Sequence, residues 1–80
     1  MSYDVAIVKE QGVTFVVVCV EDSVLDSSSR SDEVWRKYQR QYGLPTAIVG
    51  AQRYRIFGDH RIVPFLGSVD LTQLPWRRAA

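Results

Sequence analysis

The chain has 80 residues, of which 46% are hydrophobic and 24% are charged, and its net charge is +1. This length and composition are typical of one small globular domain and exclude a chain that is disordered throughout. The single cysteine excludes an internal disulfide and a zinc site built from several thiolates. We expect one domain over residues 1–80, in which residues 74–80 form a loosely ordered tail.

The N-terminal residues lack the basic stretch and apolar segment of a secretory signal. The longest apolar run, residues 14–20, is far shorter than the roughly 20 residues that cross a membrane. These observations predict a cytoplasmic protein that has no membrane partner.

Residues 14–20 (Thr-Phe-Val-Val-Val-Cys-Val) are rich in β-branched side chains, and both of their alternating sets are apolar. This pattern predicts a central strand that is covered on two faces. Residues 3–8 alternate as a second strand, and Gly12 suits a two-residue hairpin loop at residues 11–12. That loop pairs apolar residues across the hairpin: Val5 with Val18, Ala6 with Val17, Ile7 with Val16 and Val8 with Phe15.

A helix is expected over residues 32–42, with Ser29 or Ser31 as its N-cap and acidic residues in its first turn. Gly43 is the expected C-cap, and Pro45 prevents continuation. The apolar stripe of this helix consists of Val34, Trp35, Tyr38 and Tyr42.

Residues 46–49 are a third strand, which a right-handed crossover places parallel to residues 14–20. Residues 53–57 alternate as a fourth strand. Residues 62–69 fit either a short helix with Pro64 in its first turn or a fifth strand. We prefer the helix, because the strand alternative sets Ile56 opposite Arg61.

The expected fold class is therefore α+β: a mixed four-stranded sheet with the element order β-β-α-β-β-α. Over residues 13–70 this order partly resembles the thioredoxin-like topology, including Pro45 just before the strand that opens a β-β-α ending. The chain lacks the Cys-x-x-Cys motif of that family, so the resemblance concerns topology alone. We expect either helices on opposite faces of the sheet and a monomer, or helices on one face and a dimer through the bare face.

No catalytic constellation, metal site or cofactor motif is visible in the sequence. Cys19 lies within the apolar strand, where a buried, unreactive thiol is expected. His60 is the only histidine and is expected in an exposed turn. The carboxylates of residues 21–33 lack the spacing of a calcium loop, so we interpret them as solvated. The chain is therefore not expected to be an enzyme, and no cofactor is expected.

Charge is unevenly distributed: residues 1–33 carry −5 and residues 34–80 carry +6. Such asymmetry indicates either a surface for an acidic partner or two halves that neutralise each other within the fold. Arg53, Arg55 and Phe57 project from one face of the expected fourth strand, an arrangement that suits RNA or single-stranded DNA. The candidate binding residues are Arg36, Arg40, Arg53, Arg55, Phe57, Arg77 and Arg78.

The sequence predicts a small non-catalytic protein-interaction module whose partner is another protein or a second copy. The alternative is weak binding of RNA or single-stranded DNA through the arginine–aromatic face. The alternative requires Arg53 and Arg55 to share one surface with Arg40 or Arg77.

Overall fold

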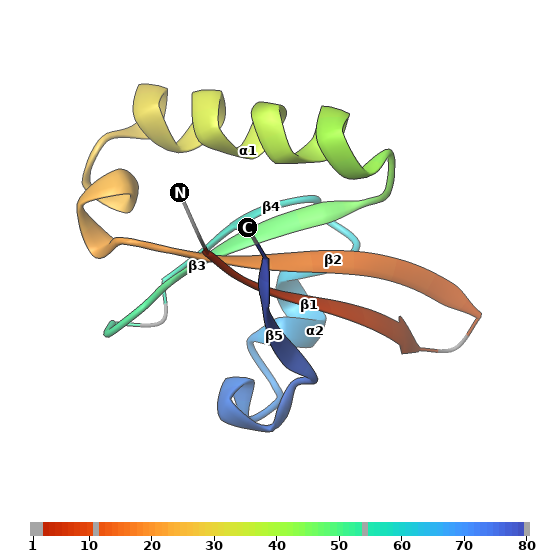
Figure 1. Ribbon diagram of the computed structural model, residues 1–80. Helices are drawn as coiled ribbons and strands as arrows, with labels where there is room; N and C mark the ends of the chain where they lie inside the picture. The colour runs from red at the N-terminus through yellow and green to blue at the C-terminus, as the bar shows by residue number, and fades with distance from the viewer. Residues whose placement is uncertain (1–2, 11, 54, 80) are drawn as a thin grey trace.

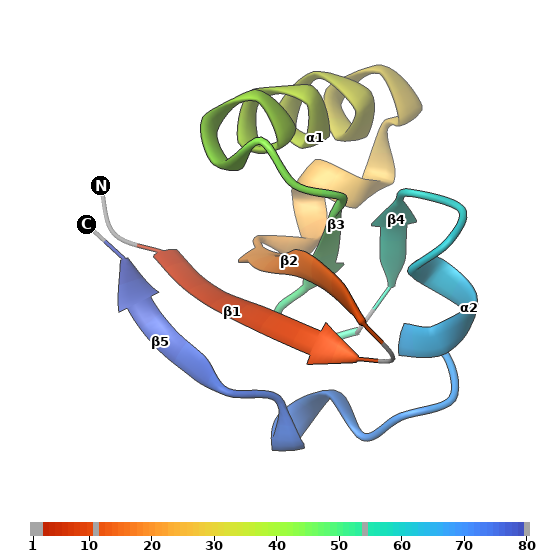
Figure 2. The same ribbon diagram turned by 90° about the vertical axis from the view of Figure 1, so that its right-hand side faces the viewer.

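The computed structural model of the chain describes residues 3–10, 12–53 and 55–79. Its centre is a five-stranded mixed sheet with the strand order β4-β3-β2-β1-β5 (Figures 1 and 2). The long helix α1 covers one face of the sheet, and the short helix α2 covers the other. The two helices therefore lie on opposite faces, as one of the two expected arrangements requires.

The hairpin of β1 (Tyr3–Glu10) and β2 (Val13–Val20) has the predicted register. Val5 pairs with Val18, and Ile7 pairs with Val16. Gly12 has a φ of 80°, which a tight hairpin turn demands and which glycine adopts without strain. The prediction of this hairpin is confirmed.

The connection from β2 to β3 (Thr46–Gly50) consists of the 3₁₀ helix η1 (Asp22–Asp26) and α1 (Ser28–Tyr42). β3 pairs parallel with β2, as predicted from the crossover. Gly43 ends α1 at a φ of 65°, and its N–H donates to the carbonyl oxygen of Gln39 at 2.9 Å. The predicted C-cap is therefore confirmed.

The start of α1 was predicted wrongly, because the helix begins at Ser28 and is capped by Ser27. The Ser27 hydroxyl accepts a hydrogen bond from the Arg30 N–H at 3.4 Å. Ser31, one of the two predicted caps, is buried inside the helix and donates to the carbonyl oxygens of Ser27 and Val24. Asp32 consequently lies beyond the first turn. It forms an ion pair with Arg36 and does not lie at the positive N-terminal end of the helix as predicted.

The fourth strand is shorter than predicted: β4 spans Ile56–Gly58 and pairs antiparallel with β3. Arg53 lies in the preceding turn, and Tyr54 lies outside the described residues. That turn is drawn toward η1 because the Asp22 carboxylate accepts from the N–H groups of Gln52 and Arg53. The chain resumes the sheet only after Arg55.

Residues 62–69 contain the expected short helix, α2 (Val63–Leu66), with Pro64 in its first turn. A 3₁₀ turn, η2 (Leu71–Gln73), follows before Pro75, also as expected. The strand alternative for residues 62–69 is wrong.

The predicted four-stranded sheet is corrected by a fifth strand, β5 (Trp76–Ala79), which pairs antiparallel with β1. This segment was expected to be a loosely ordered tail. It adds to the edge of β1 opposite β2, because Tyr3–Ala6 offer backbone groups there. No thioredoxin-like topology is confirmed for the resulting sheet.

Two apolar clusters flank the sheet. Val5, Val16, Val18, Val24 and Ile48 pack toward α1. The cluster toward α2 contains Ala6, Phe15, Val17, Ala47, Val49, Ile62, Leu66 and Leu71. β2 contributes to both clusters, so its prediction as a central, doubly covered strand is confirmed.

Cys19 departs from its prediction, because its side chain is only half-buried. It lies opposite Asp4 of β1, near the end of β2, where the last two residues of the strand are only partly buried. Partial burial raises the pKa of the thiol, and the nearby carboxylates of Asp4 and Asp22 raise it further. A raised pKa leaves little thiolate at neutral pH, so the expected low reactivity has an electrostatic cause as well as partial burial.

A tyrosine cluster joins the start of β1 to the end of α1. The hydroxyls of Tyr3 and Tyr42 share a hydrogen bond of 2.7 Å, and Gln41 Nε2 donates to the Tyr3 hydroxyl at 2.8 Å. The ring of Tyr38 lies 5.0 Å from that of Tyr3. Partial burial and the hydrogen bond to Tyr3 raise the pKa of Tyr42 from 10.0 to about 12.

This raised pKa predicts a loss of stability at alkaline pH. The contribution of Tyr42 is fully present below pH 10.0, where the unfolded side chain is also protonated, and is lost as the pH rises to about 12. The measurement is the free energy of unfolding in urea across this range for the natural chain and Tyr42→Phe. We expect a shallower decline for Tyr42→Phe. Parallel pH profiles would show that Tyr42 titrates alike in both states.

Candidate functional site

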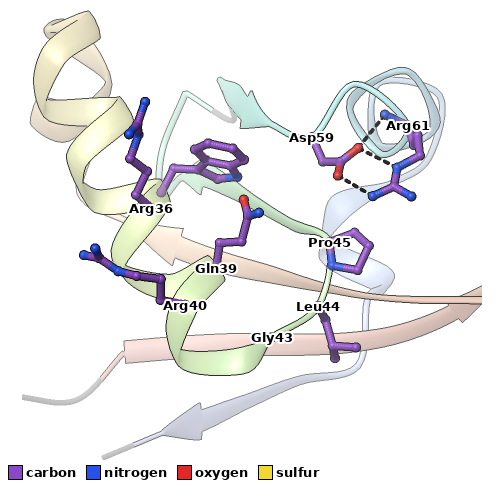
Figure 3. A pocket seen from close by; sticks show the side chains of 9 residues that line it. Arg36, Gln39, Arg40, Gly43, Leu44, Pro45, Asp59 and Arg61 are labelled. Carbon is purple, nitrogen blue, oxygen red and sulfur yellow. Dashed lines mark hydrogen bonds and ion pairs between the residues drawn. The ribbon is translucent and has the colours of Figure 1, made fainter.

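A hollow of about 630 Å³ lies between the C-terminal half of α1 and the loop that joins β4 to α2. In Figure 3, Arg36 and Arg40 lie on the α1 side, the Asp59–Arg61 pair lies opposite, and Gln39 and Pro45 lie between them. We call this site the arginine hollow. It is lined by Trp35, Arg36, Gln39, Arg40, Gly43, Leu44, Pro45, Asp59 and Arg61.

The α1 side of the arginine hollow is held in place by the end of the helix. Gly43 turns the chain in the left-handed conformation, so that Leu44 and Pro45 follow directly beneath the last helical turn. Trp35 Nε1 donates to the carbonyl oxygen of Thr46 at 2.7 Å. This bond fixes the indole against the start of β3. The Phe57 ring packs edge-on against the indole, with 6.1 Å between the two ring centroids.

The opposite side depends on Asp59. Its N–H donates to the carbonyl oxygen of Thr46 at 3.1 Å, and its own carbonyl oxygen accepts from the N–H groups of Ile62 and Val63. Its carboxylate accepts from the Arg61 N–H at 2.9 Å, from Nε at 3.0 Å and from Nη2 at 2.8 Å. These bonds, above all those from the Arg61 side chain, lower the pKa of Asp59 to about 2.

The three arginines of the hollow differ in how far they are neutralised. Arg36 Nε pairs with Asp32 at 2.8 Å, and Arg61 pairs with Asp59. Arg40 is exposed in the last turn of α1, and none of the ion pairs found among the described residues includes it. The hollow and its immediate carboxylate partners therefore carry a net charge of about +1, centred on Arg40.

Gln39 contributes an unusual feature to the lining. Its Oε1 is buried and accepts no hydrogen bond from the described residues. A buried acceptor without a partner costs roughly 1–3 kcal/mol, so a donor brought to this position would be favoured.

The predicted binding residues do not form one surface. Arg36 and Arg40 border the arginine hollow. Phe57 is partly buried beneath α1, packed on Trp35, and does not form an exposed aromatic platform. Arg77 and Arg78 lie on β5, at the edge of the sheet farthest from β4, and Arg78 Nε pairs with Asp4 at 2.9 Å.

Arg55 ties η1 to the turn before β4. Its guanidinium donates to the carbonyl oxygens of Leu25 and Asp22 and to the Asp26 carboxylate at 2.6 Å. Arg53, two residues earlier, is exposed in the turn. The expected face of Arg53, Arg55 and Phe57 is therefore divided, because each side chain has a different environment.

Arg55 and Arg53 provide a matched pair for a stability test. Arg55→Gln removes three hydrogen bonds donated by the charged guanidinium, one of them to a carboxylate, and we expect it to lower the free energy of unfolding by about 1–3 kcal/mol. Arg53→Gln is expected to change it by no more than about 0.5 kcal/mol. Chemical denaturation of both variants is the measurement. Equal effects would contradict the structural role of Arg55.

The charge asymmetry of the sequence is largely resolved within the fold. Arg36, Arg55 and Arg78 of the basic half pair with Asp32, Asp26 and Asp4 of the acidic half. Sequence reasoning missed Arg61, Asp59, Gln39 and Trp35 as members of one site. The spacing of these residues in the sequence does not indicate that the β4–α2 loop lies close to the end of α1.

Over the described ranges, no group of three or more His, Cys, Asp or Glu side chains is placed to hold a metal ion. No helix in the same ranges combines the length and apolar character that crossing a membrane requires. No family model matches the chain, and no curated protein or solved structure matches it either.

Proposed function

We propose that the chain is a small non-catalytic protein-interaction domain whose contact surface is the arginine hollow. The observation that supports this most is the lining itself, which combines Arg36, Arg40 and Arg61 with the apolar residues Leu44 and Pro45. Apolar surface with arginine at its border is common in protein contact sites. The single free cysteine is compatible with a reducing, cytoplasmic setting for this interaction.

A protein segment suits the hollow better than a nucleic acid strand. Binding a strand through its phosphates needs a row of cations along the path of the backbone. Arg55 is committed to η1 and Phe57 to the contact with Trp35, so the arginine–aromatic face is not assembled. The arginines of β5 lie at the far edge of the sheet.

The occupant we propose is a segment of another protein and not a second copy of this chain. The acidic residues of the chain are largely engaged: Asp26 by Arg55, Asp32 by Arg36, and the Asp22 carboxylate by backbone N–H groups. The exposed glutamates that remain, Glu10, Glu21 and Glu33, lie in or directly beside folded elements, so they do not offer the free extended segment that we propose as the occupant. Head-to-tail filling of this kind would join copies into rings or open chains, which light scattering detects as a mass above that of the monomer.

The test is selection from a displayed library of random peptides on the immobilised chain. We expect enriched peptides that bind the natural chain and lose binding to the double variant Arg40→Gln and Leu44→Ser. Arg30→Gln, on the first turn of the same helix, is the control and should retain binding. The absence of enrichment, or equal binding to the double variant, would contradict the proposal.

A further inference from the structure

We infer that the arginine hollow recognises a peptide segment through one carboxylate side chain, an adjacent apolar side chain and the main-chain N–H between them. This inference rests on the proposed function and names the chemistry of the partner. Three independent features of the lining support it: its net charge, its apolar members and the unpartnered oxygen of Gln39.

The charge of the hollow fits a single negative charge. Asp32 and Asp59 already neutralise Arg36 and Arg61, at 2.8 Å in each case. Arg40 remains as the cation that a ligand can engage, and its exposed side chain has the rotational freedom to fold over the hollow. A carboxylate matches this charge, whereas a phosphate dianion leaves an excess negative charge next to Asp59.

The position of the apolar lining indicates what accompanies the carboxylate. Leu44 and Pro45 follow α1 directly and line the same hollow as Trp35. An aliphatic side chain placed there removes apolar surface from water on both partners, a gain of about 25 cal/mol per Å². A neighbouring residue in an extended segment brings its carboxylate within the range of Arg40.

Gln39 supplies the third contact. Figure 3 shows its side chain extending from α1 into the space between the two arginine-bearing sides of the hollow. Its Oε1 lacks a donor among the described residues, and a peptide main chain offers an N–H at every residue other than proline. In the bound state, the Gln39 amide turns to accept the N–H of the acidic residue of the ligand.

The test uses three capped tetrapeptides that differ at one position: acetyl-Gly-Leu-Glu-Gly-amide and its versions with glutamine or phosphoserine in place of glutamate. Affinities for the full chain are measured by calorimetry or NMR titration. We expect the glutamate peptide to bind about tenfold more tightly than the glutamine peptide. The phosphoserine peptide should bind no more tightly than the glutamate peptide.

Two variants assign the contacts. Arg40→Gln should lower the affinity of the glutamate peptide to that of the glutamine peptide, whereas Arg30→Gln leaves both unchanged. Gln39→Met should weaken binding about fivefold. Methylation of the glutamate nitrogen should weaken binding to the natural chain but not to Gln39→Met, because the contact it removes is already absent there.

The outcomes separate this inference from the proposed function. If the displayed peptides bind the hollow but glutamate has no advantage over glutamine, the inference is overturned and the proposed function stands. Tighter binding of the phosphoserine peptide than of the glutamate peptide overturns it in the same way. If neither the displayed peptides nor the tetrapeptides bind the hollow, both fail.

Discussion

Gly58→Ala is expected to lower the free energy of unfolding by about 2–5 kcal/mol. Gly58 has a φ of 152°, which side-chain-bearing residues rarely adopt. A Cβ atom there would lie 2.6 Å from the Thr46 carbonyl oxygen and 2.7 Å from Ala47 Cα. Since β3 is fully buried, neither backbone atom can move freely. An 80-residue domain has a total stability of roughly 4–12 kcal/mol, so this loss is a large part of it.

Gly67→Ala is the matched control. Gly67 follows α2 at a φ of −68°, and an added Cβ would meet no atom of the rest of the chain closer than 3.6 Å. This substitution should be neutral or stabilise the fold by up to about 1 kcal/mol. Urea denaturation of both variants is the measurement. Equal stability of the Gly58 and Gly67 variants would contradict the close approach of β4 to β3.

Ile48→Ala should lower the free energy of unfolding by about 2–5 kcal/mol, because the side chain has no exposed surface. Ile48 lies on β3 between Val18 and Phe57 and faces α1. Truncation leaves a cavity beneath the helix that carries Trp35, Arg36 and Arg40.

Ile7→Ala is the control for this second substitution. Ile7 is 39% exposed on the hairpin, so its truncation removes less buried surface and should cost about 1 kcal/mol or less. Thermal or chemical denaturation separates the two variants. A larger loss for Ile7→Ala than for Ile48→Ala would contradict the placement of α1 over the central strands.

The sheet centre was predictable because its register depends on local patterns. The hairpin of β1 and β2 has one loop length that matches apolar residues across every inner pair, and the structure adopts it. The parallel placement of β3 followed from the crossover through α1. Gly43 marked the end of the helix because its left-handed conformation favours glycine.

The predictions were wrong where several residues carried the same local signal or where the sequence carried no local signal for the structure. Ser27, Ser28, Ser29 and Ser31 lie close together at the start of α1, and each can serve as an N-cap, so the sequence does not select Ser27. β5 has two arginines among its four residues, a composition that conceals an edge strand. Arg55 alternates with Phe57 as a strand residue would, but its guanidinium meets η1, about 30 residues away in the sequence.

The arginine hollow was predictable only in part. Arg36 and Arg40 were identified from the polar face of the helix, a local pattern. Asp59 and Arg61 join them only because β4 pairs with β3 and returns the chain to the end of α1. Such a site depends on tertiary arrangement, which composition and periodicity do not report.

The most direct test of the proposed contact surface is NMR mapping with the peptides enriched from the displayed library. An ¹⁵N-labelled sample of the full chain is titrated, and the shift of each backbone amide is followed. If the arginine hollow is the contact surface, the largest shifts fall on residues 35–44 and 59–61, the two segments that border it. Shifts concentrated on β5 or on the tip of the β1–β2 hairpin, with these segments unchanged, would contradict it.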